Sequence, residues 1–155
     1  MLLIDAIRKA ENDKLVKKLS KDHFLCSAFA FVRDGDVKEW ILHFFSPERK
    51  KMVDCFVGNS IIIGEETPAI KDMQELDTGK IKVSSERALK IVEKNFEKKI
   101  VSSMMSLHGK ENIIWTVSMI TQDMMITSFD IDAVTGEIID KKEESLIRSQ
   151  NKIGS

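Results

Sequence analysis

Apolar residues change their spacing along the chain, and this spacing predicts the elements of the first half. From Leu3 to Ser20 they recur at helical intervals, and Asn12-Asp13 predicts a break there because both residues favour caps and turns. The later apolar segments have the character of strands, and they cover 24–33, 37–45, 52–57 and 60–63. Asp34-Gly35, between the first two segments, predicts a tight hairpin, since glycine accepts a positive φ without penalty.

The second half follows the same order after a polar, irregular stretch at 65–78. A helix is expected to begin at Ser84 or Ser85, and its apolar face consists of Ala88, Leu89, Val92 and Phe96. Strands are then expected at 100–107, 113–120, 125–132 and 137–140. The charged and polar residues from Lys141 onward predict either a frayed terminus or a short terminal helix.

This parallel order favours an internal duplication. Similar features recur at offsets of 74 to 76 residues, and they are Gly35 and Gly109, Trp40 and Trp115, and Ile62-Ile63 and Ile138-Ile139. The alternative, that any two α+β halves share some strand spacing, stays open. The resulting division is a first half at 1–66, a connection at 67–79, a second half at 80–141 and a polar tail at 142–155.

Composition narrows the functional classes. The chain has 155 residues, 43% of them hydrophobic, and its charges nearly cancel, with 24 positive and 25 negative side chains. Nucleic-acid binding usually needs a basic excess, so this balance argues against it. Asp5, Arg8 and Lys9 interrupt the first apolar segment, which therefore does not resemble a secretory signal, and no segment approaches the length of a membrane span. We expect a cytoplasmic protein.

The cysteines and histidines, which often serve as catalytic or metal-binding residues, are not arranged for either role. Cys26 and Cys55 lie in strand-like apolar segments, which favours two buried free thiols over a disulfide. His23, His43 and His108 form no close ligand pairs with them, so we expect neither a metal nor another cofactor. The sequence also contains no nucleophile elbow, phosphate loop or dinucleotide-binding motif. We therefore predict that the chain is not an enzyme and has no catalytic residues.

Adjacent apolar residues in several strands indicate that the sheet has two apolar faces. Neighbouring side chains on a strand point to opposite faces, so each of the pairs Phe44-Phe45, Met104-Met105 and Met124-Met125 places one side chain on each face. Phe45, Met104 and Met124 are therefore predicted to form an apolar interaction surface on the face away from the helices. For the methionines, a soft core beneath the helix is the alternative. The other half of the chain, a second copy or a target protein would cover such a surface.

The second half also contains a series of short motifs. Its helix begins on Ser84-Ser85-Glu86, an aromatic-led strand contains Trp115, and 129–139 follows the pattern apolar-x-apolar-Asp-Ala-x-Thr-Gly-x-apolar-apolar. Asp132, Thr135 and Gly136 of this turn have a structural role, because the aspartate can accept backbone amides and the glycine can take the left-handed conformation. Together, these features resemble a PepSY domain. The first half lacks the Asp-Ala-x-Thr-Gly turn and is, if a second copy, a degenerate one.

The resemblance implies an α+β fold of two similar halves, each a helix packed on an antiparallel sheet, in a tandem PepSY-like or cystatin-like arrangement. It also implies a non-catalytic binding or inhibitory module of unknown target, related to peptidases. Two alternatives stay open: a small cytoplasmic dimeric chaperone or adaptor, and a small-molecule-binding domain with a pocket between helix and sheet. The expected partner is an unknown protein or a second copy of the chain, rather than nucleic acid or membrane.

Overall fold

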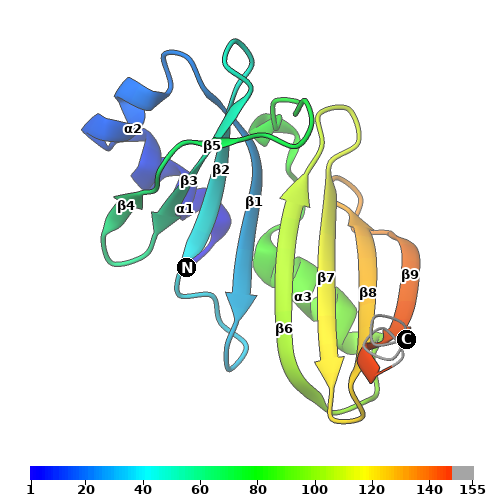
Figure 1. Cartoon of the computed structure of the whole chain (residues 1–155). Coiled ribbons are helices and arrows are strands. Elements are labelled where there is room, and N and C mark those ends of the chain that lie inside the picture. Colours follow the sequence, from blue (N-terminus) through cyan, green and yellow to red (C-terminus); the bar gives the residue numbers. More distant parts are fainter. Residues whose placement is uncertain (148–155) are drawn as a thin grey trace.

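The computed structural model describes residues 1–147, which form an α+β architecture. The helices are α1 (Leu3–Glu11), α2 (Lys14–Leu19) and α3 (Ser85–Lys94), with a short 3₁₀ helix, η1 (Thr78–Lys80). The strands are β1 (Phe24–Val32), β2 (Trp40–Ser46), β3 (Lys51–Val57), β4 (Ile61–Ile63), β5 (Thr67–Pro68), β6 (Ile100–His108), β7 (Ile114–Thr121), β8 (Met125–Asp132) and β9 (Ile138–Ser145). They form one nine-stranded sheet in the order β4-β3-β2-β1-β6-β7-β8-β9, with β5 paired to β3 (Figure 1).

Local signals in the sequence define the helices. The side chain of Asp13 accepts a hydrogen bond from the N–H of Leu15, so α2 begins directly after the break expected at Asn12-Asp13. Ser84 caps α3 by accepting from the N–H of Arg87. The longer helices each bury one apolar face, formed by Leu3, Ala6, Ile7 and Ala10 in α1 and by Ala88, Leu89 and Val92 in α3. These faces pack onto one side of the sheet and form a single core.

The pairing of β1 with β6 joins the two halves. Residues from Ser27 to Val32 pair antiparallel with residues from His108 to Ser103. The sheet therefore continues through the centre of the molecule instead of ending at the edge of each half. The sequence predicted a helix and antiparallel strands in each half, and it contained no signal that one sheet would hold both.

Trp40 and Trp115 meet above this junction. Their strands, β2 and β7, are separated by β1 and β6, so at ordinary strand spacing their backbones lie about 14 Å apart. Their ring centroids are nevertheless only 6.0 Å apart, with the rings tilted at 54°. The two indoles therefore lean toward each other across the core face, where Ala28 and Ala30 of β1 are fully buried and leave room for them.

The same two indoles fix the positions of both long helices. The N–H of Trp40 donates to the carbonyl of Met1 at 3.0 Å, and the N–H of Trp115 donates to the carbonyl of Val83 at 2.9 Å. Each acceptor lies two residues before the first residue of a helix, α1 in one case and α3 in the other. The start of each helix is thus hydrogen-bonded to the tryptophan of its own half.

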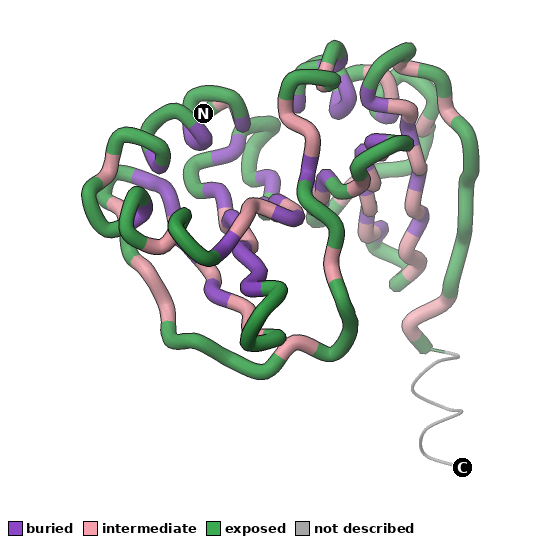
Figure 2. The backbone as a smooth tube through the Cα atoms, turned by 90° about the horizontal axis from the view of Figure 1, so that it is seen from above, coloured by how far each residue is buried: buried purple, intermediate pink, exposed green. Residues whose placement is uncertain are grey.

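The connection between the halves contains more structure than the sequence suggested. Most residues of 64–80 are exposed and run outside the buried parts of the two halves (Figure 2). β5 pairs with β3 through Lys51↔Pro68 and Met52↔Thr67, and the N–H of Leu76 donates to the carbonyl of Leu25. At the other end, β9 continues to Ser145, beyond the boundary expected at 141, because Met125 to Phe129 of β8 are available to pair with it. The expected tail beyond residue 147 lies outside the described residues.

Substitution of the adjacent residues Met104 and Met105 on β6 tests which of them faces the helices. Met105 faces the helices and is 1% exposed, whereas Met104 lies on the opposite face and is only half-buried. Met105→Ala should lower the free energy of unfolding by about 2–5 kcal/mol, because it leaves a cavity in the core. Met104→Ala should lower it by about 1 kcal/mol or less. Urea unfolding of both variants measures this difference, and equal losses would contradict the faces assigned to the two side chains.

Candidate functional site

The face of the sheet opposite the helices carries a group of apolar side chains. Paired residues on β4, β3, β2 and β1 form a row across it, through Ile62↔Phe56, Phe56↔Ile41 and Ile41↔Phe29. Phe31 lies beside Phe29, with the ring centroids 5.0 Å apart in an edge-to-face contact. We call this group, together with Met104 on β6, the apolar patch; its members are Phe29, Phe31, Ile41, Phe56, Ile62 and Met104.

The apolar patch is accessible to a partner. Phe31 is 52% exposed and Ile62 is 59% exposed, and the remaining members are half-buried. Contiguous exposed apolar side chains of this kind often mark an interaction site on a soluble protein. On the part of the chain that the structure describes, all three α-helices lie on the other side of the sheet, as Figure 1 shows.

The same face becomes polar in the second half. On β7 and β8, the hydroxyl of Thr116 donates to Asp130 at 2.7 Å, and the hydroxyls of Ser118 and Ser128 are 2.8 Å apart. These cross-strand hydrogen bonds satisfy the polar groups within the sheet itself. These polar pairs occupy the middle of β7 and β8, and the isoleucines on this face of the second half, Ile114, Ile120 and Ile126, lie near the strand ends.

The apolar patch ends at a hollow of about 230 Å³ in the β1–β2 hairpin. Pairing of the two strands stops at Phe29↔Ile41, and the chains separate before they meet again at the Arg33↔Asp36 bridge. Side chains of Phe31, Ile41, Arg33 and Lys38 line the hollow. Glu39 lines it as well, so apolar groups and charged groups of both signs adjoin at this end of the sheet.

The structure does not bring the three predicted surface residues together. Met104 lies on the open face, opposite Phe31 in the β1–β6 pairing. Met124 is 41% exposed, but it lies in the turn between β7 and β8 with a φ of +62°, so the prediction that it faces outward from a strand is wrong. Alternation failed there because Met124 precedes the first residue of β8.

The prediction for Phe45 is also wrong, because this side chain is 1% exposed. The ring of Phe24 packs against it with centroids 5.6 Å apart, and the Nζ of Lys50 lies 5.9 Å from its ring centroid. A bulge in β1 between Leu25 and Ser27 changes the pairing at this end of the sheet. The sequence did contain a signal for the residues that were missed: both alternating sets of β1 are apolar, and one of them includes Phe29 and Phe31.

The turn between β8 and β9 is built around Asp132. Its Oδ1 accepts hydrogen bonds from the N–H of Val134 at 2.8 Å and of Thr135 at 3.2 Å, and its carbonyl accepts from the N–H of Gly136. The hydroxyl of Thr135 accepts from the N–H of Glu137, and Gly136 has a φ of +82°. Carbonyl and amide groups of Ala133 bond to 82–83 and to Ile113, so the turn also holds the segment that leads into α3.

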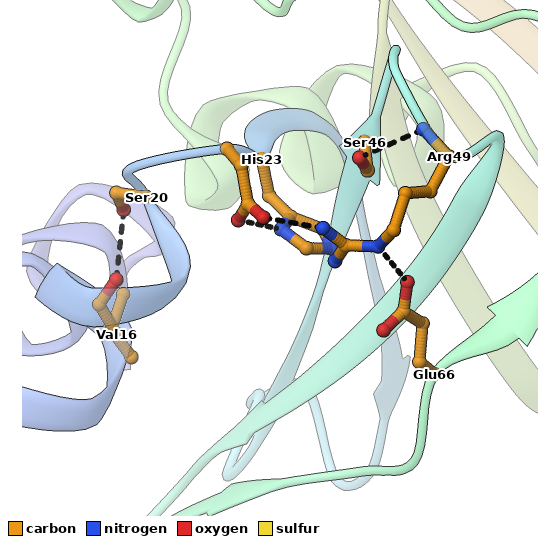
Figure 3. Close-up of polar contacts among 7 residues, drawn as sticks. Val16, Ser20, His23, Ser46, Arg49 and Glu66 are labelled. Atoms are coloured by element: carbon orange, nitrogen blue, oxygen red, sulfur yellow. Dashed lines mark hydrogen bonds and ion pairs between the residues drawn. The ribbon is translucent and has the colours of Figure 1, made fainter.

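A second group of polar side chains ties the connection to the first half (Figure 3). The Nδ1 of His23 is 2.7 Å from Oδ1 of Asp22, and Arg49 donates to Oδ2 of Asp22 at 2.5 Å and to Glu66 at 2.9 Å. The guanidinium of Arg49 lowers the pKa of Asp22, with a smaller contribution from His23, and it also lowers the pKa of Glu66. The network therefore links the α2–β1 loop, the β2–β3 turn and the segment leading into β5.

The two cysteines are free and buried, as the sequence indicated. Burial raises the pKa of the Cys26 thiol and raises that of Cys55 to about 11, so both are protonated near neutral pH. Among residues 1–147, no group of three or more His, Cys, Asp or Glu side chains is placed to hold a metal ion. Nor does any helix in that range have the length and apolar character needed to cross a membrane.

Substitution of Asp132 should show how much the turn contributes to stability. Asp132→Ala removes the acceptor of two backbone amides and should lower the free energy of unfolding by about 1–2 kcal/mol. Glu137→Ala is the control, because only the backbone of Glu137 takes part in the turn, and its effect should stay within about 0.5 kcal/mol. Chemical unfolding compares them, and a harmless Asp132→Ala would show that the turn forms without its side chain.

The Arg49 network should make the protein sensitive to acid. Asp22 and Glu66 have folded-state pKa values below their ordinary ones, so their contribution is present above the ordinary carboxyl pKa and is lost as the pH falls through the folded-state value. Arg49→Gln should therefore show a smaller loss of stability between pH 6 and pH 3 than the unmodified chain. Lys50→Gln, which removes the exposed ion pair with Asp72, is the control and should retain the full dependence. The measurement is the urea midpoint of unfolding between pH 6 and pH 3. An equal fall of this midpoint in the unmodified chain and in both variants would refute the prediction.

Comparison with known proteins agrees with these features. Residues 82–142 match the family model of PepSY, described as "Peptidase propeptide and YPEB domain". A crystal structure of a protein from Clostridium difficile 630, described as "a putative lipoprotein", is similar to the chain with a TM-score of 0.62 at 15% sequence identity, and the match covers 93% of each chain. At that identity the similarity concerns the fold alone. No curated protein sequence matches the chain.

The family match begins just before α3 and ends within β9, so it spans the helix, the aromatic-led strand β7 and the Asp132 turn. These are the parts of the second half in which Trp115 and Asp132 make their hydrogen bonds. Residues 82–142 of this chain are a PepSY domain.

Proposed function

We propose that the chain is a non-catalytic binding or inhibitory module directed at a peptidase, and that it contacts its partner through the apolar patch. The match of the second half to a domain described for peptidase propeptides is the observation that carries the class of function. The apolar patch supplies the surface, since contiguous exposed apolar side chains often mark a protein interaction site.

Side-chain chemistry supports a binding role. Both thiols have a raised pKa, so neither is available as a thiolate nucleophile near neutral pH. The Nδ1 of His43 is bonded to Asp54 at 2.7 Å, and Cys26 approaches the backbone carbonyl of His43 instead of its ring. The thiol of Cys26 and the imidazole of His43 lie on neighbouring strands, but they are not paired as a nucleophile and a general base.

We also propose that the first half is a degenerate second copy of the PepSY unit. The strand order β4-β3-β2-β1 mirrors β9-β8-β7-β6 about the central junction. In each half the tryptophan donates to a carbonyl two residues before the helix. The first half differs in two ways, because it contains the additional helix α2 and because it turns at Gly58-Asn59-Ser60 where the second half has the Asp132 turn.

The two halves would then have different roles. The second half keeps the family turn and a polar open face whose hydroxyls are bonded to one another. The first half has lost the turn and carries most of the apolar patch. In this proposal the second half supplies the stable part of the sheet and the first half contacts the partner. The compartment expected from the sequence, the cytoplasm, stays a prediction.

Site-specific photocrosslinking tests the proposal. A benzoylphenylalanine in place of Phe31 lies within the apolar patch, whereas one in place of Ser118 lies on the same face in its polar half. In cells of the source organism, the first variant should form an adduct with a protein that contains a peptidase domain, identified by mass spectrometry, and the second should not. Size-exclusion chromatography with light scattering should show no dimer through this face.

The other outcomes are equally informative. Adducts of the Phe31 variant with another copy of the chain would replace the proposal with a homodimer. Equal crosslinking at both positions, or adducts only with proteins that have no peptidase domain, would overturn it.

A further inference from the structure

A hollow of about 210 Å³ lies between the first turns of α1 and α3. Its apolar walls include Leu3 and Ile7 of α1, Ile81 and Val83 of the segment that leads into α3, and Trp115 of β7. We call this space the interhelix hollow. Both halves of the chain are needed to form it, because the PepSY match does not include α1. Sites for drug-sized ligands usually measure about 300–1,000 Å³, so the interhelix hollow suits a shorter molecule.

The hydroxyl of Ser85 is an unpaired polar group at the interhelix hollow. Ser85 lines the hollow and lies on the buried face of α3 with Ala88 and Leu89, and the residue is only 5% exposed. Among residues 1–147 its Oγ has no hydrogen-bond partner, but it is not fully enclosed, as the unpaired hydroxyl oxygen of Thr127 is. Since buried hydroxyls are normally paired, this one is available to a group that enters the hollow.

The start of α3 adds backbone donors beside this hydroxyl. The N–H of Arg87 is capped by the side chain of Ser84, and the N–H of Ala88 donates to the carbonyl of Ser84. The N–H groups of Ser85 and Glu86 have no partner in the part of the chain that the structure describes, as is usual for the first residues of a helix. Such groups, at the positive end of the helix dipole, attract an anion.

The formal charges at the interhelix hollow favour an anion as well. Lys82 is the single charged side chain that lines it within the described residues, and none of the ion pairs in that range includes Lys82. Glu86 lies in the first turn of α3, but it is exposed and is not part of the lining. The lining therefore combines apolar side chains with hydroxyl groups and one ammonium group, and it contains no carboxylate.

We propose that the interhelix hollow binds a short aliphatic carboxylate. An ionised carboxylate only accepts hydrogen bonds, and here it would meet the hydroxyl and N–H of Ser85, the N–H of Glu86 and the ammonium group of Lys82. The alkyl chain would contact Leu3 and Ile7. This site is formed by the helices and is separate from the apolar patch, so it does not depend on the proposed peptidase partner.

Titrations with three six-carbon probes test the proposal on the full chain. Hexanoate, 1-hexanol and hexylammonium are each added at pH 7 to protein with labelled methyl groups, and NMR follows the methyls of Leu3, Ile7 and Val83, with Ile62 of the apolar patch as the reference. Hexanoate should give saturable shifts at the first three methyls and none at Ile62. 1-Hexanol should bind at least fivefold more weakly, and hexylammonium should not bind.

Three results of these titrations would overturn the proposal. They are the absence of saturable shifts with hexanoate, hexanoate shifts at Ile62 alone, and an affinity for 1-hexanol or hexylammonium that equals or exceeds the affinity for hexanoate.

A serine substitution tests the buried hydroxyl. Ser85→Ala should raise the Kd for hexanoate about tenfold, as expected for a lost hydrogen bond to a charged group, and alanine is well suited to the helix. Ser102→Ala is the control, because Ser102 is exposed on β6 and does not line the hollow, and it should leave the Kd unchanged. Equal affinities of the two variants would contradict the contact assigned to Ser85.

Charge variants at exposed positions keep the test valid if Ser85→Ala does not fold. Lys82→Gln should raise the Kd for hexanoate about threefold and leave that for 1-hexanol unchanged, whereas Lys90→Gln, further along α3, should change neither. Glu86→Gln removes a negative charge from the first turn and should lower the Kd for hexanoate about threefold. Equal effects of Lys82→Gln and Lys90→Gln, or weaker hexanoate binding by Glu86→Gln, would contradict a carboxylate held at the start of α3.

Discussion

The contact between Trp40 and Trp115 is the interaction on which the rest of the structure depends. The two rings meet across two intervening strands, on the face where β1 contributes the small, buried side chains of Ala28 and Ala30. The contact requires β1 and β6 to be neighbours, and the indole N–H groups then place both long helices on the same side of the sheet.

Because the helices pack on one face of the sheet, the side chains on the other face can differ between the two halves. In the second half, hydroxyl and carboxylate groups bond to one another across strands and leave little to offer a partner. In the first half, the same face carries the apolar patch, of which Phe31 and Ile62 are more than half exposed at 52% and 59%. The open face of one continuous sheet thus differs in chemistry between its two halves.

Features set by neighbouring residues could be predicted from the sequence, and features set by distant ones could not. Asp13 caps a helix and Asp132 closes a turn within three residues, so both signals are visible in the sequence itself. The register between β1 and β6 depends on segments far apart in the chain, and no local pattern specifies it. Phe45 is covered by Phe24 and Lys50, and simple alternation along one strand does not reveal such neighbours. Arg49 and its two carboxylate partners, Asp22 and Glu66, come from separate segments, so that cluster became visible only in three dimensions.

The order of the strands leaves β4 and β9 as the two outer strands, and their sequences bear on self-assembly. Exposed strand edges tend to recruit further strands, and charged or very short edge strands prevent this. β9 carries a run of five charged side chains of both signs, from Asp140 to Glu144, and β4 is only three residues long. Growth of the sheet into fibrils by edge-to-edge addition is therefore disfavoured at both ends, although the chain exposes apolar side chains on its open face.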